Sequence, residues 1–397
     1  MKQVVQVRLD TTREQFRALS ATLAACNNTA NVVSAAAYAA GASHHRLHPR
    51  DLQAKTYAQA RQAGLGSQAA VRCIKKVADA YTTLRANLKA GNYGENGSRR
   101  RAKAESRPVT FRPEAAQPFD DRNLSWDWAS TDPRRGAVSI WTLEGRLKGV
   151  SFVGHPDQVA LLRQYRKGET DLLIRGGVAY LIATLEAPEK PLNLSPHLGD
   201  PGGWLGTDLG IANIATTSDG RKSAGKTVNR YRQRQVRLRA RLQAKGTKSA
   251  RRLLKKRARK EARFAADVNH QVSKEIVTEA ERTGRGIALE NLTGIRDRAR
   301  LRKPQRVALH SWAFAQLGEF ISYKARRAGV PASFVDPAYT SQRCSACGAV
   351  DKKSRRNQAE YQCTSCDFVE HADVNAAINI ASRAAGDWAA VNQPYAA

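Results

Sequence analysis

Apolar and polar positions follow two different periodicities along the N-terminal half of the chain. Residues 2–9, KQVVQVRL, alternate in steps of two and carry β-branched side chains, which predicts a strand. Between residues 12 and 88 the apolar spacing is helical and rich in alanine, with breaks at residues 41–50 and 64–66. We therefore expect a strand followed by a helical segment.

The spacing of apolar residues changes after residues 91–107, which we expect to form a basic loop. Five short alternating runs, separated by turn residues, predict a small β-barrel: VTFRP, AVSIWTL, LKGVSFVG, TDLLIRGG and VAYLIATL. We expect the first strand of the chain to join this barrel. Residues 188–203 are rich in proline and glycine and mark a boundary.

The second half begins with WLGTDLGIANIATTSDG, which reads as two strand-like runs meeting at a glycine. A long basic region follows and predicts two helices that turn near Gly246. GIALENLTG then predicts a strand ending at an acid, HSWAFAQLGEFISYKARRAGV a packing helix, and SFVD another short strand.

The charge balance indicates a polyanionic partner. Sixty-six Lys and Arg face 35 Asp and Glu, giving a formal net charge of +31, and the isoelectric point is about 10.4. Glu261 is the only acid between Lys226 and Arg263. Most charge runs are solvated helical faces, but one so uneven repels itself, which favours contacts with nucleic-acid phosphates. The candidates for these contacts are Arg230, Arg234, Arg241, Lys245, Arg252, Lys255 and Lys256.

A membrane partner fits the sequence less well. The N-terminus has no secretory apolar core, and residues 19–42, the most apolar window, are interrupted by Asn27, Asn28 and Asn31. That window predicts a buried helix rather than a membrane span. We expect a cytoplasmic protein with no membrane partner.

Four of the six cysteines are paired at metal-ligand spacing. Cys344 and Cys347 form one Cys-x-x-Cys knuckle, and Cys363 and Cys366 form another. In a chain of this kind the spacing indicates a four-thiolate zinc site rather than two disulfides. A closed site of four thiolates leaves no position for substrate, so the zinc is expected to be structural.

Three acids stand where strands end or a helix begins. Asp208 lies in an apolar strand-like run, Glu290 closes another, and Asp373 opens an alanine-rich helix. Each acid also has a purely structural interpretation: Asp208 as a turn residue, Glu290 as a strand-end residue and Asp373 as a helix N-cap. Together they form a set of hard oxygen ligands for Mg²⁺, and carboxylates can hold two metals that promote phosphodiester hydrolysis.

The order of these motifs resembles the TnpB family of transposon-encoded, RNA-guided DNA nucleases, which are related to type V CRISPR effectors. GTDLGIANIAT resembles the first RuvC motif of that family, IALENLTGI the second and HADVNAAINIA the third. SWAFAQLGEFISYKARRAGV followed by PAYTSQRCSACG resembles its helix and the entry to its zinc ribbon. The resemblance is strongest over residues 204–385.

The resemblance implies a multidomain α+β protein whose catalytic residues are Asp208, Glu290 and Asp373. It implies a guide RNA from the transposon end and the cutting of double-stranded DNA beside a short transposon-adjacent motif, and we expect a monomer on one RNA. In such systems base pairing reads the target and protein reads the flanking motif. The implied domains are a wedge-like β-barrel (1–10 and 108–202), a helical recognition segment (11–107), an RNase H-like RuvC nuclease domain (203–339 and 371–386), an inserted zinc ribbon (340–370) and a C-terminal tail (387–397).

Other functions share parts of this pattern. A compact type V CRISPR effector has the same core motifs, and genomic context separates the two. An RNA-guided repressor without cleavage is expected to lack RuvC acids, whereas Asp208, Glu290 and Asp373 are all present in this chain. A strand-transferring transposase with an RNase H-like triad would not need RNA.

Four further residues near these motifs each allow two interpretations. His371 either orients Asp373 or makes a local hydrogen bond, which is the commoner role. Arg343 either touches a phosphate or is a surface residue. Asn375 and Asn379 either support the third motif or cap the helix and face solvent.

Overall fold

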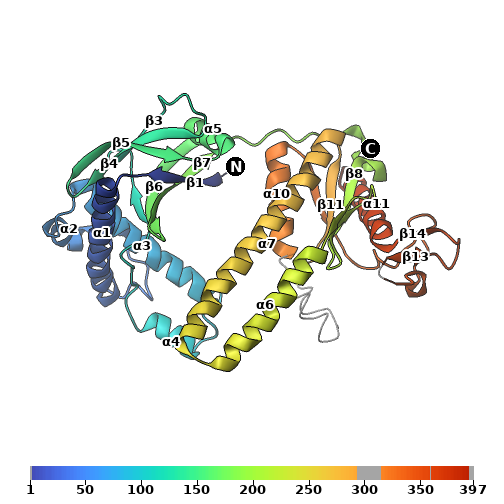
Figure 1. The fold of residues 1–397 in the computed structure, drawn as a ribbon, viewed down its shortest axis with the longest axis horizontal. Coiled ribbons are helices and arrows are strands. Elements are labelled where there is room, and N and C mark those ends of the chain that lie inside the picture. The colour runs from blue at the N-terminus through green and yellow to red at the C-terminus, as the bar shows by residue number, and fades with distance from the viewer. Residues whose placement is uncertain (1, 293–313, 358, 393–397) are drawn as a thin grey trace, which may run out of the picture. The chain divides into compact units, whose positions relative to one another are not determined.

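The computed structural model describes residues 2–292, 314–357 and 359–392. The chain divides into two compact units between Pro188 and Glu189 (Figure 1). Among the described residues, no helix combines the length and apolar character that crossing a membrane requires.

Unit 1 is built around a seven-stranded antiparallel sheet with the order β2-β6-β7-β1-β5-β4-β3. Its outermost strands, β2 and β3, follow one another in the chain, so the sheet is nearly closed into a barrel. Strand β1 pairs with β7 and β5 in the middle of the sheet, as expected. The elements of unit 1 are β1 (Lys2–Asp10), α1 (Arg13–Ala39), α2 (Pro49–Gln62), α3 (Ser67–Lys89), α4 (Arg99–Glu105), β2 (Gln117–Phe119), β3 (Leu124–Asp127), β4 (Arg135–Thr142), β5 (Gly145–Val153), α5 (Pro156–Tyr165), β6 (Arg166–Arg175) and β7 (Val178–Glu186).

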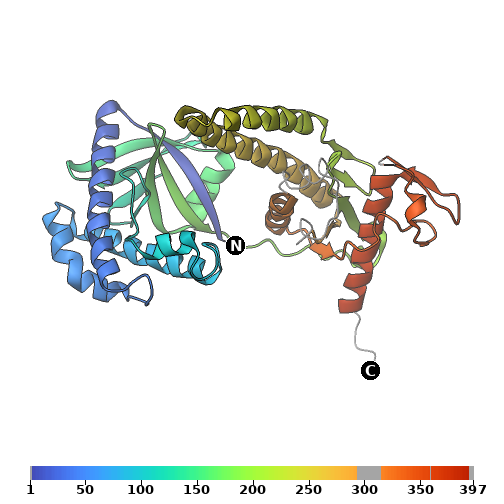
Figure 2. The same ribbon diagram turned by 90° about the horizontal axis from the view of Figure 1, so that it is seen from below.

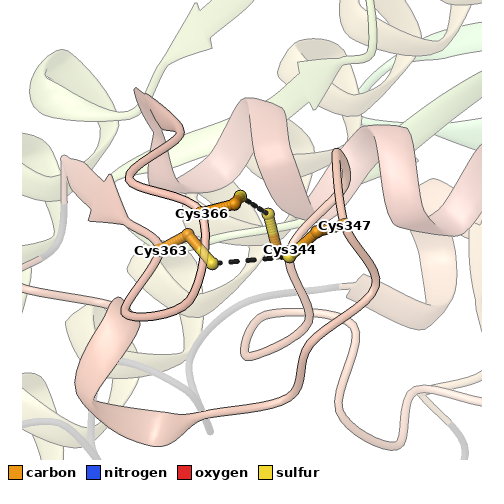
Figure 3. A group of neighbouring side chains, drawn as sticks. All are labelled: Cys344, Cys347, Cys363 and Cys366. Carbon is orange, nitrogen blue, oxygen red and sulfur yellow. Dashed lines mark hydrogen bonds between the residues drawn. The ribbon is translucent and has the colours of Figure 1, made fainter.

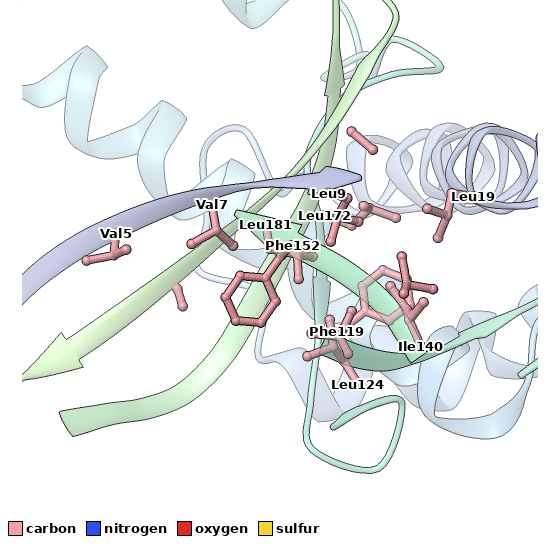
Figure 4. Packing of buried hydrophobic residues seen from close by; sticks show 14 of the residues in the cluster. Val5, Val7, Leu9, Leu19, Phe119, Leu124, Ile140, Phe152, Leu172 and Leu181 are labelled. Carbon is pink, nitrogen blue, oxygen red and sulfur yellow. The ribbon is translucent and has the colours of Figure 1, made fainter. Parts of the chain in front are cut away.

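The core of this barrel follows from the alternation in its strands. Val5, Val7 and Leu9 of β1 are buried, while the residues between them face outward. They pack with side chains of the neighbouring strands and with Leu19 of α1 (Figure 4). The period of two predicted from β1 is therefore the period of the barrel interior.

The predicted strand VTFRP, at residues 109–113, is wrong. The segment lies against the helices, and its backbone groups bond to side chains instead of to a neighbouring strand. Ser34 donates to the carbonyl of Val109 (2.6 Å), and Asn31 bonds both the amide (2.7 Å) and the carbonyl (3.0 Å) of Phe111. The polar residues that interrupt the apolar window of α1 thus hold this segment.

The expected basic loop at residues 91–107 contains a short helix, α4. Ser98 caps it by accepting a hydrogen bond from the amide of Arg101 (3.4 Å), and Arg101 pairs with Glu105 at i+4 (3.0 Å). A serine N-cap and one ion pair stabilise a helix locally, although neither adds apolar periodicity to the sequence.

Unit 2 contains a five-stranded sheet with the order β10-β9-β8-β11-β12, in which β8, β11 and β12 are parallel. Helix α11 covers one face of β8 and β11, and α7 and α10 cover the other (Figures 1 and 2). The elements are β8 (Trp204–Asp208), β9 (Asn213–Thr217), β10 (Lys222–Ala224), α6 (Lys226–Lys245), α7 (Lys248–Thr283), β11 (Gly286–Glu290), α10 (Phe314–Ala328), β12 (Ala332–Val335), β13 (Glu360–Gln362), β14 (Val369–His371) and α11 (Ala372–Asn392), with 3₁₀ turns at Pro196–Gly199, Pro201–Gly203 and Lys352–Ser354.

The two basic helices form the predicted hairpin. Helix α6 ends at Lys245 and is followed by Gly246, whose φ of 63° is the left-handed conformation that glycine adopts without strain. The rings of Tyr231 and Phe264 pack between the helices, with centroids 4.3 Å apart.

Helix α11 continues to Asn392, into the stretch that we expected to form a tail from residue 387. Trp388 accounts for this, because its ring packs edge to face on that of Trp204 with centroids 5.8 Å apart. Residues 393–397 lie outside the described part of the chain.

Candidate functional site

Asp208 and Glu290 close two neighbouring parallel strands. Thr207 of β8 lies opposite Leu289 of β11, so the two acids follow side by side at the carboxyl ends of their strands. In open α/β sheets this edge is where ligands bind, because loops diverge there and leave a crevice.

Helix α11 brings Asp373 to the same edge through a close backbone approach. A Cβ on Gly206 would lie 1.9 Å from the carbonyl oxygen of Ala377, so only glycine allows the helix this near the strand. Asp208 is two residues after Gly206 and therefore shares the face that α11 covers. Asp373 lies in the first turn of α11 and is 3% exposed.

Burial and neighbouring charges raise the pKa of two of these acids, Asp208 and Glu290. Burial is the largest cause, and together with the charges of Glu290 and Asp373 it raises the pKa of Asp208 to about 7, against the opposing charge of Arg355. Burial also raises the pKa of Glu290, against a hydrogen bond donated by the hydroxyl of Thr340. A set of three acids at one sheet edge is suited to a cation.

Asp373 has two polar partners that the sequence does not predict. The amide of Asn213, on β9, donates to one carboxylate oxygen (2.9 Å). The guanidinium of Arg355, from the chain between the two cysteine knuckles, pairs with the other (2.9 Å). Arg355 also lowers the pKa of Asp208 and Glu290, so one cation acts on all three acids.

The N-cap interpretation of Asp373 is wrong. His371 makes the capping contact, because its Nδ1 accepts a hydrogen bond from the backbone amide of Asp373 (3.2 Å). The local hydrogen-bonding role expected for His371 is therefore confirmed. The carboxylate of Asp373 points instead to Asn213 and Arg355.

The four cysteines of the knuckles form a compact cluster (Figure 3). All four sulfurs lie within 4.8 Å of one another, and Cys344–Cys366 and Cys347–Cys363 are 3.7 and 3.6 Å apart. These distances exceed the roughly 2.0 Å of a disulfide. They match the edge of a tetrahedron of about 3.8 Å that Zn–S bonds of about 2.3 Å produce.

The sulfur geometry suggests a zinc site. A backbone hydrogen bond from Ser365 is the main cause that lowers the pKa of Cys363 to about 7, whereas the neighbouring thiols raise the pKa of Cys366, so it is the sulfur geometry that supports zinc. Among the described residues no other group of ligand atoms meets within that distance, so the oxygens of Asp208, Glu290 and Asp373 are more widely spaced than the sulfurs.

Two asparagines of α11 fasten the first knuckle to the helix. Asn375 accepts from the amide of Ser345 (2.9 Å) and donates to the carbonyl of Arg343 (2.8 Å). Asn379 donates to the carbonyls of Thr340 (3.0 Å) and Arg343 (2.7 Å). Both asparagines are buried, so they support this segment and do not face solvent. The backbone of Arg343 is their partner, and its side chain is exposed.

Replacing Asn379 with alanine is expected to destabilise unit 2 by about 1–3 kcal/mol. The variant leaves the buried carbonyl oxygen of Thr340 without its side-chain donor and removes one of the two side-chain donors to the carbonyl of Arg343. Denaturant unfolding measures the loss. Ser382→Ala is the matched control, because its exposed hydroxyl bonds only within the helix and its removal should cost under about 0.5 kcal/mol. Equal losses in both variants would contradict the fastening role.

The basic residues predicted to contact phosphates all lie exposed on the α6–α7 hairpin. Contacts between the two helices use other side chains, among them the Arg239–Glu261 ion pair and a hydrogen bond from Arg257 to Gln235 (3.1 Å). The exposed set comprises Arg230, Arg234, Arg241, Lys245, Arg252, Lys255 and Lys256.

The C-terminal region matches the model of one known domain family. The family described as "Cas12f1-like, TNB domain" matches residues 314–380, which include α10, the cysteine cluster and the start of α11. The fold of the chain is similar to one in a cryo-EM structure of a Cas12f1–sgRNA–target DNA complex. The TM-score is 0.58 at 12% identity, over 96% of this chain and 98% of that one.

A second solved structure, of the mini-RNA-guided endonuclease CRISPR-Cas phi3, matches with a TM-score of 0.53 at 10% identity, over 97% of this chain and 92% of that one. At such identities the likeness shows the fold alone. It establishes a multidomain α+β fold resembling Cas12 effectors.

Particular relatives confirm the resemblance to TnpB-like proteins and extend it to Cas12f. The chain is 42% identical to the CRISPR-associated endodeoxyribonuclease Cas12f1 of Sulfoacidibacillus thermotolerans over 30% of this chain and 27% of that protein. It is 34% identical to a TnpB-like protein of Methanocaldococcus jannaschii over 32% and 46%. It is 29% identical to the putative RNA-guided DNA endonuclease InsQ of Escherichia coli over 44% and 48%. The chain thus spans about a quarter to a half of the length of these curated relatives.

Proposed function

We propose that this protein is an RNA-guided, Mg²⁺-dependent endonuclease that cleaves double-stranded DNA beside a short flanking motif. One observation carries the proposal. Asp208, Glu290 and Asp373, from three distant parts of the sequence, meet at one sheet edge, where burial and mutual repulsion raise the pKa of Asp208 to about 7. The names of its relatives support the same activity.

The carboxylate set fits magnesium, because it offers hard oxygen donors and carries negative charge that a cation relieves. When bound between such acids, Mg²⁺ activates water and stabilises the leaving oxygen of a phosphodiester. Asp208, Glu290 and Asp373 would hold it. Water then adds to phosphorus as the bond from phosphorus to the leaving oxygen breaks.

Other residues hold this arrangement in place. Asn213 and Arg355 fix the carboxylate of Asp373, and Thr340 fixes that of Glu290. Arg355 is a quarter exposed and brings positive charge from the cysteine module to the place where a phosphate would sit. A zinc ion held by the four thiolates would keep that module folded and supply no chemistry of its own.

The proposed domains are those that the resemblance implies. Residues 203–339 and 371–386 form the RuvC nuclease domain, and residues 340–370 form the zinc ribbon. The barrel of unit 1 is the wedge-like domain, and residues 11–107, with α1–α4, form the recognition segment. The protein acts as a monomer on one RNA, in the cytoplasm of a prokaryote.

The source of the RNA separates two versions of the proposal. In a TnpB protein the guide is transcribed from a transposon end, and in a compact CRISPR effector it comes from a CRISPR array. Among these three relatives the highest identity, 42%, is to a Cas12f1, whereas the largest matched share of a relative, 48%, is of InsQ. We propose the transposon-encoded version and keep the CRISPR effector as the alternative.

The deciding experiment purifies the protein from its native locus and sequences the RNA that accompanies it. That complex is then offered a matching plasmid with a randomised flank, in Mg²⁺ and in EDTA. We expect cutting that needs the RNA, the matching sequence, a defined flank and Mg²⁺. A preparation without bound RNA, or equal cutting without it, would contradict the proposal.

The α6–α7 hairpin is expected to contribute salt-sensitive RNA affinity. Replacing Arg230 and Arg234 with glutamine should weaken binding to single-stranded RNA. It should also flatten the plot of log K against log salt by about 0.7 for each phosphate that is no longer neutralised. Anisotropy titrations at several salt concentrations measure this slope. Arg282→Gln is the control, because Arg282 is already paired with Glu279 (2.6 Å). An unchanged slope in the double variant would remove the hairpin from the RNA interface.

A further inference from the structure

A hollow beside the carboxyl end of β11 has no role in the reaction proposed above. Its volume is about 580 Å³, which is within the range of ligand pockets. Helix α10 forms one wall, and the ends of β11 and β12 form the other. Glu290 is among the lining residues, so the hollow adjoins the proposed catalytic carboxylates.

The aromatic ring of Phe334 lines this hollow and is 49% exposed. Phe334 lies on the edge strand β12, opposite Leu289 of β11, and both side chains face α10. Leu289 is fully buried on that face, whereas half of the Phe334 ring remains uncovered. A large aromatic surface that the described residues leave open next to a reaction site indicates a partner that stacks on it.

Gly318 keeps the opposite wall open. It lies in the middle of α10, where glycine is less favourable than alanine, so helix formation does not explain its presence. A Cβ at this position would lie 3.6 Å from the Phe334 ring, at ordinary contact distance. Any longer side chain would extend into the hollow and occupy the space over that ring.

The charges of the residues that line the hollow favour a neutral base as its ligand over a phosphate. Glu290 and Glu319 both line the hollow and repel an anion, while a neutral aromatic base meets the rings of Phe334 and Tyr323. Arg326 also lines it, is exposed, and has no carboxylate partner among the residues described. It is placed to meet a phosphate that remains outside.

We propose that this hollow binds one unpaired base of a DNA single strand by stacking on Phe334, next to the phosphate that is cut. The proposal rests on the endonuclease function above and adds a positioning site for its substrate. A base inside a duplex is already stacked and paired, so the site takes DNA only after the two strands have been separated. Base–aromatic stacking tolerates any sequence, as a guided nuclease requires.

Photochemical crosslinking tests the site without cleavage. The Asp208→Asn protein, with its co-purified RNA, is mixed with single-stranded oligonucleotides that each carry one 5-iododeoxyuridine, irradiated, and mapped by peptide mass spectrometry. We expect an adduct on Phe334 or Tyr323, and loss of that adduct in Phe334→Ala and in Gly318→Leu. Adducts confined to residues outside the hollow would overturn the proposal.

Cleavage kinetics provide a second test of the stacking site. Phe334→Ala should raise KM by about tenfold, Phe334→Trp should restore it, and Gly318→Leu should behave as Phe334→Ala although the ring is intact. Leu192→Ala, also exposed and outside the hollow, is the control, and thermal unfolding checks each variant. If wild type cuts and Phe334→Ala cuts equally well, the stacking site is wrong and the nuclease proposal stands. If wild type never cuts, the nuclease proposal fails, and crosslinking still decides whether the hollow binds a base.

Discussion

Asp208→Asn is expected to lower the rate of DNA cleavage by about 10³-fold or more while leaving RNA binding intact. A carboxylate that holds a catalytic metal contributes several kcal/mol to the transition state, and about 1.4 kcal/mol corresponds to tenfold in rate. Single-turnover cutting of a matched plasmid measures the effect. Asp267→Asn removes an exposed carboxylate of the same unit and should cut as wild type. Cutting that survives in Asp208→Asn would refute the catalytic assignment.

The same variant is expected to be more stable than wild type without Mg²⁺. The folded pKa of Asp208, about 7, lies above its ordinary value of 3.8, so the folded state binds the proton more tightly. Wild-type stability should therefore fall as pH rises from about 4 to about 7, by a few kcal/mol at most. Asparagine removes this loss. Unfolding measured across that pH range compares the two proteins, and added Mg²⁺ should stabilise wild type more than the variant.

Cys363→Ser is expected to abolish zinc binding and, with it, cleavage. Structural zinc contributes on the order of 10 kcal/mol to the folding of small metal modules, so residues 340–370 should become sensitive to protease while unit 1 resists. Cleavage should be lost with the ribbon, because Arg355 reaches Asp373 from this module. Elemental analysis should give about one zinc per chain in wild type and none in the variant.

Cys73→Ala is the matched control for zinc. Cys73 is a buried core residue of α3, and burial raises the pKa of its thiol to about 12, so it does not act as a thiolate ligand. We expect it to retain the metal. Retained zinc in Cys363→Ser, or disulfides in the wild-type cluster, would exclude the four-thiolate site.

The sequence predicts well those features whose signal is local. The alternation in β1, the glycine turn between α6 and α7, and the strands ending at Asp208 and Glu290 are all present in the structure. The cysteine spacing likewise predicts the cluster of sulfurs. In each case a short stretch of chain contains the whole pattern.

The features that the sequence does not predict depend on distant contacts. Arg355 meets Asp373 because the cysteine module folds back onto α11, and nothing near Arg355 in the sequence sets it apart from other surface arginines. The run VTFRP has the composition of a strand, but Asn31 and Ser34 of α1 satisfy its backbone groups first. Tertiary hydrogen bonds override local propensity at such places.

Gly206 has a consequence for how this protein tolerates mutation. Because β8 and α11 meet there backbone to backbone, the placement of Asp373 relative to Asp208 is set without an intervening side chain. Substitutions elsewhere in the surrounding core can then change volume while the relation between these two acids persists. A single added methyl group at residue 206 would instead force the helix off the strand. The spacing of the acids is thus insensitive to most of the core and highly sensitive at one position.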